Sequence, residues 1–231
     1  MMKKPAMRRR RECLGSWVLG CFVALALPFA AHATDSTVEK RGGDLPRVLL
    51  LGDSISMGYD KPARERLAGK ASVHRPAENC QSTQHALKRI DAWLGITSWD
   101  VIHFNWGIWD AHHLADDRFR TTPKEYEQNL RKLVSRLKAT GAKLIWASTT
   151  PLQGRIAQGG IWVEESEIPI RNAIASKVMK ENGIPINDLY QEMLPHIEKL
   201  HSRDGCHFTS AGYAFLAQHV AESVMEAQDP K

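Results

Sequence analysis

The sequence predicts an α/β fold in which a mainly parallel β-sheet carries helices on both faces. Short continuous apolar runs, as at residues 48–51 and 144–147, are typical of strands covered on both sides. Longer amphipathic stretches separate these runs, and alternating strands and helices form parallel βαβ units. The 231 residues suit one ordinary domain, and 43% hydrophobic with 25% charged residues excludes a disordered chain.

Five strands are expected, at residues 48–51, 71–74, 101–105, 144–147 and 184–186. Gly52 ends the first strand, and a Ser-Thr-Thr-Pro segment follows the fourth. Both features interrupt regular structure. Because parallel sheets of this kind bind ligands at the carboxyl ends of their strands, the residues after each strand are the candidates for function.

Helices are expected at residues 83–94, 169–181, 188–201 and 210–226, and a further helix begins at Thr122. Thr122 as N-cap, Pro123 and Glu125 form a capping-box pattern there. Apolar side chains then recur on one face until Gly141 ends this helix. On the helix at 169–181, Arg171 and Asn172 are expected to be solvated or to cap.

Residues 1–33 are predicted to be a secretory signal peptide. Six basic residues precede an uncharged apolar stretch at 13–31, and Ala31-His32-Ala33 supplies a cleavage site after Ala33. Two alternatives remain, an uncleaved membrane anchor and a lipid on Cys21, which follows Val-Leu-Gly. Residues 34–46 are expected to be a flexible linker before a domain at 47–229. The protein is therefore expected to be exported, periplasmic or secreted, with membrane contact only through those two alternatives.

The net charge of +5 lies entirely in this N-terminal segment, since residues 34–231 contain 25 basic and 25 acidic residues. The balanced domain therefore gives no reason to expect a nucleic-acid partner. No cofactor is expected, because neither G-x-G-x-x-G nor a P-loop occurs. His103, His112 and His113 lie near Asp110 in the sequence, but they lack zinc-binding spacing, so no metal is predicted.

Two segments carry residues suited to nucleophilic chemistry. Ser54, in Gly52-Asp53-Ser54, follows the first strand and begins a helical segment, where backbone N–H groups favour a developing anion. A serine needs a base to take its proton. Asp204 and His207 precede the last helix, and an Asp can hold one ring nitrogen while the other faces the serine. Alone, Asp53 or Ser54 could simply cap a helix.

In these blocks the sequence resembles the SGNH or GDSL hydrolases, from about Arg47 to the final helix. The segment HFNWGIWD resembles an exported bacterial subgroup of that family. The resemblance implies a flavodoxin-like three-layer α/β/α sandwich with a five-stranded sheet. It also implies that Ser54 is the nucleophile, His207 the general base and Asp204 the group that orients His207.

The resemblance further implies an oxyanion hole made by the Ser54 N–H, a glycine N–H of a second block and an asparagine side chain of a third. The second block here has no glycine, so the backbone N–H of Cys80 or Gln81 is expected to substitute. Trp109 stands at the asparagine position. Asn105 is therefore the first candidate for the missing donor, followed by Asn79 and the Trp109 indole N–H.

Position and compartment together suggest a disulfide between Cys80 and Cys206, which would join the second-block loop to the His207 loop; two free thiols are the alternative. Trp106 and Trp109, with Asp53, are expected to contact substrate, and tryptophan faces, including that of Trp162, suit sugar rings.

The leading hypothesis is an exported serine esterase that cleaves small acyl esters, among them O-acetyl groups on carbohydrate. A non-catalytic carbohydrate-binding protein and an O-acyltransferase that uses the same three residues are the alternatives. The expected partner is thus a small-molecule or glycan ester.

Overall fold

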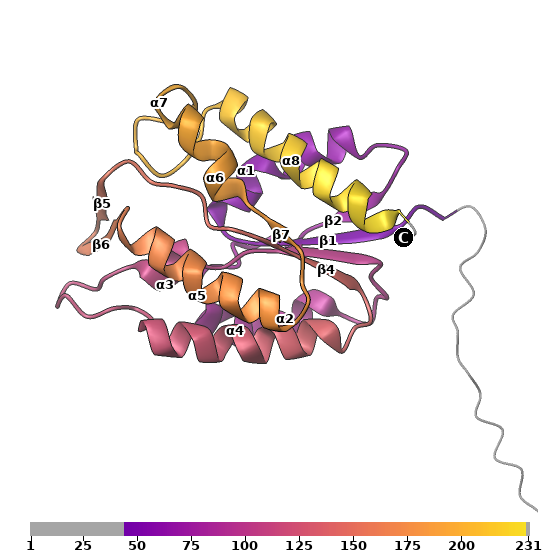
Figure 1. Ribbon diagram of the computed structural model, residues 1–231, viewed down its shortest axis with the longest axis horizontal. Coiled ribbons are helices and arrows are strands. Elements are labelled where there is room, and N and C mark those ends of the chain that lie inside the picture. The colour runs from indigo at the N-terminus through magenta and orange to yellow at the C-terminus, as the bar shows by residue number, and fades with distance from the viewer. Residues whose placement is uncertain (1–43, 230–231) are drawn as a thin grey trace, which may run out of the picture. The chain divides into compact units, whose positions relative to one another are not determined.

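The computed structural model describes residues 44–229 (Figure 1). The predicted signal peptide, the alternative lipid site at Cys21 and linker residues 34–43 lie outside the described residues. The last linker residues, 44–46, have no regular secondary structure. Within the described range, no helix combines the length and apolar character needed to cross a membrane.

Five parallel strands form the central sheet, as the apolar runs predict. They are β1 (Arg47–Leu51), β2 (Ser72–His74), β3 (Val101–Phe104), β4 (Lys143–Ala147) and β7 (Ile186–Asn187), in the order β2-β1-β3-β4-β7. The fifth strand begins two residues later than predicted, because it pairs with β4 through Trp146 opposite Ile186. The carboxyl ends of all five strands therefore lie at one edge of the sheet.

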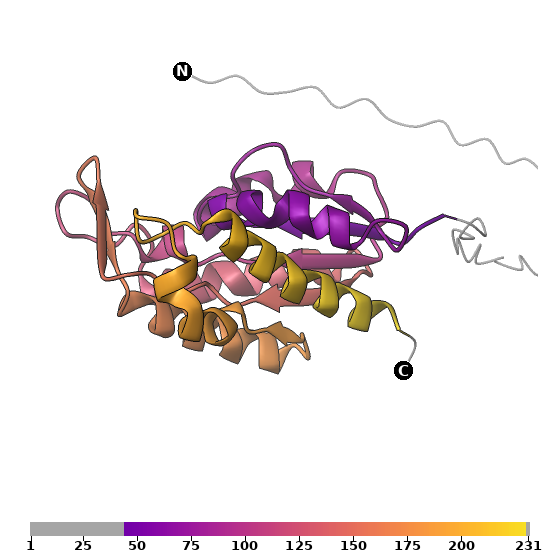
Figure 2. The ribbon, with the colours of Figure 1, turned by 90° about the horizontal axis from the view of Figure 1, so that it is seen from above.

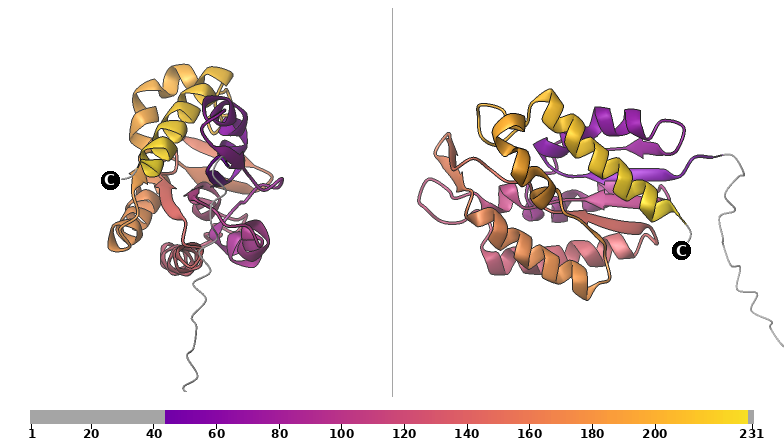
Figure 3. Two further views of the ribbon diagram at one scale, coloured as in Figure 1. Left: turned by 90° about the vertical axis from the view of Figure 1, so that its right-hand side faces the viewer. Right: turned by 45° about the horizontal axis from the view of Figure 1, so that its top comes forward.

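Helices cover both faces of this sheet, which confirms the three-layer α/β/α architecture (Figures 1 and 3). On one face lie α1 (Ser54–Arg66) and α8 (Ser210–Gln228). On the other lie α2 (Thr83–Leu94), α4 (Pro123–Lys138) and α5 (Glu167–Glu181). The capping box predicted for α4 is present, since Thr122 N–H donates to Glu125 Oε2 at 2.9 Å and Glu125 N–H to Thr122 Oγ1 at 3.3 Å.

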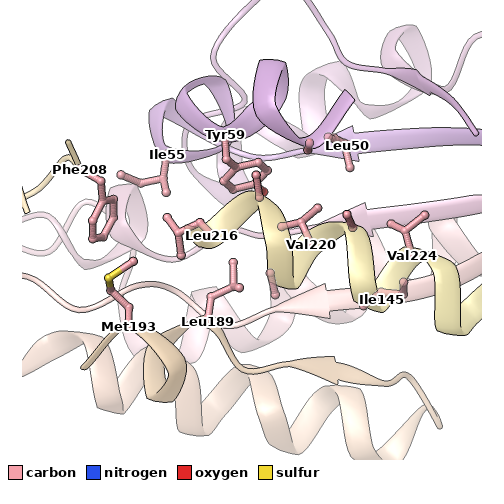
Figure 4. Close-up of a cluster of buried hydrophobic side chains, with 14 of the residues drawn as sticks. Leu50, Ile55, Tyr59, Ile145, Leu189, Met193, Phe208, Leu216, Val220 and Val224 are labelled. Carbon is pink, nitrogen blue, oxygen red and sulfur yellow. The ribbon is translucent and has the colours of Figure 1, made fainter. Parts of the chain in front are cut away.

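The core divides at the sheet, because successive strand residues point to opposite faces. Val48 and Leu50 pack with α1 and α8, in the cluster that Figure 4 shows. Leu49 and Leu51 pack with α2 and α4 instead. Each such burial stabilises the fold by about 1.5–3 kcal/mol. A strand buried on both sides needs an apolar residue at every position, which accounts for the continuous apolar run.

The close packing of α1 against α8 depends on Gly58. A Cβ added to Gly58 would lie 2.0 Å from a ring carbon of Tyr213 on α8. Glycine therefore allows the two helices to approach until ring and backbone are in contact. This contact matters for the site, because α1 begins at Ser54 and α8 follows the loop that carries His207.

The segment predicted as one helix at 188–201 is divided into three short elements. They are α6 (Leu189–Met193), the 3₁₀ turn η1 (Leu194–His196) and α7 (Ile197–Leu200). Pro195 lies in the middle of this segment. Proline has no N–H to donate and its ring clashes with the preceding turn, so a continuous helix cannot form there.

Two elements were not expected from the sequence. A short helix, α3 (Ile108–Ala111), follows β3, and an antiparallel hairpin joins β5 (Arg155–Gln158) to β6 (Ile161–Glu164). Gly159 and Gly160 form the hairpin turn with φ of 59° and 78°, backbone angles that glycine adopts without strain. The hairpin extends beyond the end of the sheet where the strands finish (Figures 1 and 2).

Two side chains on α5 have neither the solvated nor the capping role expected of them. Arg171 is completely buried, with its guanidinium carbon 5.0 Å from the Phe119 ring centroid and 5.6 Å from that of Tyr126. Asn172 accepts a hydrogen bond from Thr149 N–H and donates one to Thr149 O, each at 2.8 Å. Both residues thus stabilise the packing of α5 against the loops at the strand ends.

Candidate active site

Ser54 lies at the carboxyl edge of the sheet, as the first residue of α1. Asp53 is the N-cap of this helix, and its Oδ1 accepts a hydrogen bond from Ile55 N–H at 3.0 Å. The first N–H groups of a helix have no partner within it, so the Ser54 N–H is available to an oxygen atom placed beside the hydroxyl. Ser54 therefore combines a nucleophilic oxygen with a local positive potential.

His207 and Asp204 continue from Ser54 in one hydrogen-bonded chain. Ser54 Oγ lies 2.9 Å from His207 Nε2, and His207 Nδ1 lies 2.7 Å from Asp204 Oδ2. Ser54 and His207 are 153 positions apart in the sequence, so the fold brings them together. This arrangement lets the carboxylate fix the ring tautomer while the other ring nitrogen accepts the serine proton.

Asp204 is held in its ionised form by its surroundings. Partial burial acts to raise its pKa, but hydrogen bonds outweigh this and hold the pKa well below the usual value for aspartate. Asp204 Oδ1 accepts from the backbone N–H groups of His207 and Cys206, at 2.8 and 2.9 Å, and from Ser202 Oγ at 2.7 Å. An ionised carboxylate therefore faces His207 Nδ1 at neutral pH.

The loop that carries Asp204 and His207 is anchored at both sides. Ser202 N–H donates to His207 O at 2.8 Å, which closes the loop, and Gln153 N–H donates to Gly205 O at 2.8 Å. Gly205 has φ of +71°, and an added Cβ would lie 2.8 Å from Ile156 Cδ1 on the hairpin. Glycine at this position thus allows both the turn and the contact with β5.

Asp53 lies beneath the helix rather than at the surface of the site. It is 2% exposed, and burial raises its pKa to about 6 against smaller opposing effects of the Ile55 N–H, His207 and Arg75. The expected contact of Asp53 with substrate is thereby corrected to a helix-capping role, because its carboxylate faces the interior beside Tyr59.

The second-block loop uses its backbone donors internally. Cys80 N–H donates to Gly52 O at 3.2 Å, and Gln81 N–H donates to Asn79 Oδ1 at 2.8 Å. The expectation that the Cys80 or Gln81 N–H supplies an oxyanion donor is therefore corrected, since both N–H groups are occupied, and Asn79 is not among the residues that line the cavity with Ser54. Gln81 has φ of +47°, the left-handed conformation in which glycine would be unstrained.

Arg75, a residue that no sequence motif indicates, connects this loop to the first block. Its guanidinium donates to Gly52 O at 3.3 Å, to Glu78 O at 3.1 Å and to Ser56 Oγ at 3.2 Å. One side chain thus holds the turn before Ser54 against the second-block loop.

In the third block, the amide group of Asn105 is bound to residues at the end of β4. Its Nδ2 donates to Ala147 O at 2.8 Å and to Thr149 Oγ1 at 3.2 Å, so both amide hydrogens are engaged at the end of β4. The expected oxyanion role of Asn105 is corrected on this ground. Trp109, the residue at the asparagine position, lines the same cavity as Ser54, and its indole N–H has no acceptor within residues 44–229.

Asp110, next to Trp109, fixes the third block to α2. Its buried carboxylate accepts hydrogen bonds from Thr83 N–H, at 2.9 and 3.1 Å, and from Thr83 Oγ1. Burial raises the pKa of Asp110 to about 6, although the hydrogen bonds from Thr83 and Thr121 oppose the increase. Asp110 is therefore a structural support for α3 and the tryptophan it carries.

The predicted disulfide is not formed, and both cysteines of the described chain are free thiols. Cys80 is completely buried, whereas Cys206 lines the site beside His207. Burial raises the pKa of Cys80 to about 11 and that of Cys206 to about 12, so both carry their proton at neutral pH.

A cavity of about 240 Å³ opens over Ser54. Asp204, Cys206 and His207 line it with Ser54, and the remaining lining residues are Ile108, Trp109, His112, Arg120, Ile156, Gln158 and Ile161. A larger hollow of about 550 Å³ lies at the opposite end of the sheet, around Lys143 and Ile184, and contains no nucleophile. The smaller cavity is therefore the candidate active site.

The other aromatic residues expected at substrate lie elsewhere. Trp106 is completely buried against Phe104, and this corrects its expected substrate contact. Trp162 packs one face on His113 and the other on Arg155, so it offers no free ring face to a sugar. His103 is buried beside Asn187, and no three His, Cys, Asp or Glu side chains in the described range are arranged to hold a metal ion.

Two further parts of the cavity lining were not predicted from the sequence: the hairpin residues Ile156, Gln158 and Ile161, and Arg120. The Gly159-Gly160 pair between two β-rich segments was a usable hairpin signal. Arg120 carries no comparable signal, because its role depends on which charges the fold brings near it.

Comparison with known proteins agrees with this geometry. Residues 50–215 match the sequence profile of the GDSL-like lipase/acylhydrolase family. Among solved structures, a lipase/acylhydrolase from Enterococcus faecalis is 22% identical, with 81% of this chain and 99% of that chain covered and a TM-score of 0.67. The acetyl xylan esterase AlAXEase is 18% identical, with 77% and 99% covered and a TM-score of 0.67. No curated protein matches the sequence.

Proposed function

Since the chain belongs to the GDSL-like lipase/acylhydrolase family, whose members hydrolyse esters, we propose that it is a serine esterase acting through Ser54, His207 and Asp204. The observation that carries the proposal is the continuous chain of hydrogen bonds from Ser54 Oγ through the His207 ring to Asp204. Such a chain activates an otherwise weak serine nucleophile.

In the proposed reaction, Ser54 Oγ attacks the ester carbonyl while His207 Nε2 takes the hydroxyl proton. The tetrahedral intermediate collapses to an acyl-enzyme, and His207 returns the proton to the departing alcohol. Water then attacks the acyl group with His207 again as base, which releases the acid and restores Ser54. Asp204 stays ionised and stabilises the charged imidazole in both steps.

The oxyanion is stabilised in this proposal by the Ser54 N–H and the Trp109 indole N–H. Both lie at the cavity, and neither donates to a group of the described chain. The indole would then do the work of the asparagine side chain that the family uses in its third block. Removing such a donor slows turnover by about 10²–10³.

The proposed substrates are short acyl esters, among them O-acetyl groups on carbohydrate. The cavity of about 240 Å³ supports a short acyl chain, since it falls below the roughly 300–1,000 Å³ of drug-sized ligand sites. The structural similarity to an acetyl xylan esterase gives a reason to include acetylated glycans in the assay.

The test is a series of p-nitrophenyl esters from acetate to decanoate, hydrolysed by wild type, Ser54→Ala and the control Ser210→Ala. Ser210 is an exposed serine at the start of α8 and lies outside the cavity. Turnover is expected to be highest for the shortest esters and to be lost only in Ser54→Ala. A fluorophosphonate should label wild type and Ser210→Ala but not Ser54→Ala.

The same experiment separates the alternatives. Acetylated glycan that binds without turnover by the wild type would indicate a non-catalytic binding protein. Transfer of the acetyl group to an added sugar in preference to water would indicate an acyltransferase. Equal activity of Ser54→Ala and wild type would remove Ser54 from the mechanism.

Export is proposed from the N-terminal sequence. Expression of the full chain in a bacterium, followed by N-terminal sequencing of the secreted or periplasmic product, should give a start at Thr34. A blocked product that begins at the lipidated Cys21 would support the lipoprotein alternative, and an intact N-terminus in the cytosol would contradict export.

A further inference from the structure

Arg120 is a cation in the candidate active site without an anionic partner. It lines the same cavity as Ser54 and His207, and its guanidinium carbon lies 5.0 Å from the Trp109 ring centroid. Its Nε is enclosed, and among residues 44–229 it has no acceptor. No carboxylate of the described chain lies within ion-pair distance of Arg120.

Neighbouring arginines are paired, which makes Arg120 distinct. On the same loop, Arg118 Nε lies 2.7 Å from Asp116 Oδ2, and on the hairpin, Arg155 Nη1 lies 3.7 Å from Glu164 Oε1. Both pairs are largely exposed, where they contribute little to stability. The unpaired arginine is thus the one that faces the cavity.

Other titratable groups that line the cavity do not neutralise Arg120. Asp204 is engaged with His207 and three further donors. Burial, with a smaller effect of the adjacent Arg120, lowers the pKa of His112 to about 4, so this ring is neutral at pH 7. The thiol of Cys206 is protonated there as well. Arg120 therefore sets the potential that a bound ester meets beyond Ser54 and His207.

The loop that carries Arg120 is held against the hairpin by a row of aromatic side chains. Phe119 lies against His113 at 4.2 Å between centroids, His113 stacks on Trp162 at 3.7 Å, and Trp162 lies 3.9 Å from the Arg155 guanidinium carbon. We call the loop at residues 112–122 together with the hairpin β5–β6 the stacked wall.

Backbone bonds reinforce the stacked wall. His113 N–H donates to Trp162 O at 2.7 Å, and Arg120 N–H donates to His112 O at 2.7 Å. The residue after Arg120, Thr121, is completely buried. The backbone of Arg120 is thereby held before a ligand arrives, and preorganised groups bind with a smaller loss of conformational entropy.

We propose that Arg120 binds an anionic group of the substrate, so that the protein prefers esters that carry a carboxylate near the reacting bond. The planar guanidinium presents paired N–H donors that match a carboxylate, and such charge-assisted bonds are stronger than neutral ones. This inference rests on the proposed esterase function and specifies its substrate class. The carboxylate belongs either to the acyl part or to the alcohol part of the ester.

Two matched pairs of esters show whether the carboxylate belongs to the acyl part or to the alcohol part. For the acyl part, p-nitrophenyl hemisuccinate is compared with p-nitrophenyl butyrate. For the alcohol part, O-acetyl galacturonic acid is compared with O-acetyl galactose. In each pair, kcat/KM is measured for wild type, Arg120→Gln, Arg120→Lys and the control Arg118→Gln, which removes an exposed cation of the same loop.

The wild type is expected to prefer the anionic member of one pair by about 10- to 100-fold, as a charged hydrogen bond provides. Arg120→Gln should abolish that preference mainly through KM, Arg120→Lys should retain part of it, and Arg118→Gln should keep the wild-type ratio. Added salt should reduce the preference of the wild type. The salt dependence is measured on the wild type alone, so it still tests the preference for anions if Arg120→Gln does not fold.

Hydrolysis of neutral and anionic esters at equal rates by the wild type would overturn this inference and leave the esterase function intact. A preference for anions that Arg120→Gln retains would also overturn it, because another group would then bind the anion. Failure to hydrolyse any of the four esters would contradict the proposed function itself, and the inference would fall with it.

Discussion

The cavity has two walls whose side chains are held in different ways. Ser54, Asp204 and His207 form one of them, the hydrogen-bonded wall, in which each polar side chain is held by short bonds to backbone or side chain. In the stacked wall, ring and guanidinium contacts from Phe119 to Arg155 hold the side chains, and hydrogen bonds hold the backbone. The first sits directly on the sheet and α1, whereas the second consists of a loop and a hairpin beyond it (Figure 2).

This difference suggests a division of roles. Hydrogen bonds have narrow distance and angle limits, so they suit atoms that must exchange a proton within a few tenths of an ångström. Ring contacts form over a wider range, since offset-stacked and edge-to-face pairs both occur with centroids roughly 4.5–7 Å apart. A wall built from them can therefore change its lining, and with it the accepted substrate, while the reacting atoms stay in place. We expect changes in the hydrogen-bonded wall to alter kcat and changes in the stacked wall to alter KM.

The largest effect should follow from His207→Gln. This change removes the proton acceptor of Ser54, and loss of a member of such a triad lowers kcat by roughly 10⁴–10⁶. Steady-state kinetics with p-nitrophenyl acetate measures it. His196→Gln, an exposed histidine on η1, is the matched control and should keep wild-type turnover. A His207→Gln variant with more than a tenth of the wild-type kcat would show that another group acts as base.

Trp109→Phe tests the residue at which the two walls meet. The phenyl ring can still pack against Arg120, but it lacks the indole N–H, so kcat should fall by about 10²–10³ with a small change in KM. Trp99→Phe serves as control, because the Trp99 indole N–H donates to Leu94 O away from the cavity. If Trp109→Phe instead raises KM and spares kcat, Trp109 belongs functionally to the stacked wall.

The two walls also differ in how far the sequence could predict them. The strands follow from apolar runs such as that of β1, because burial on both faces leaves no other composition. Ser54 and the Asp204–His207 pair stand at fixed places relative to those strands, and the structure brings them together. Their side-chain roles depend on local geometry, which short motifs encode well.

The stacked wall depends on contacts between segments that are distant in sequence. Trp162 meets His113 only because the hairpin folds back over the loop, and nothing in either segment alone indicates the stacking. Asn105 was expected to face the oxyanion, yet the end of β4 supplies two acceptors that hold its amide elsewhere. Competition among nearby acceptors is decided by the tertiary fold, and one sequence does not reveal it.

Asp53→Asn tests the support beneath the hydrogen-bonded wall. In the folded protein, burial raises the pKa of Asp53 to about 6, above its ordinary 3.8. Between these two pH values the folded state holds a proton that the unfolded state has released, so the wild type loses stability as the pH rises. Asparagine still caps the helix but does not titrate. The free energy of unfolding of the wild type, relative to Asp53→Asn, should fall by up to about 3 kcal/mol from pH 4 to 7.

Urea unfolding at several pH values measures this difference. Asp116→Asn is an informative control, because a hydrogen bond from Arg118 lowers the pKa of Asp116 and the expected slope has the opposite sign. Parallel pH profiles for wild type and Asp53→Asn would mean that Asp53 titrates alike in the folded and unfolded states, and its buried position would then need another explanation.

The smallest effect is expected from Trp162→Ala, which interrupts the stacked wall without touching Ser54, Asp204 or His207. Loss of its contacts with His113 and Arg155 should reduce the free energy of unfolding by about 1–2 kcal/mol. Because Arg120 loses part of its positioning, KM for the preferred ester should rise more than kcat falls, while Trp162→Phe, which keeps an aromatic ring, should retain most of the wild-type KM. A Trp162→Ala variant that loses kcat as severely as His207→Gln would show that the two walls act as one unit, and the proposed division between chemistry and selectivity would be wrong.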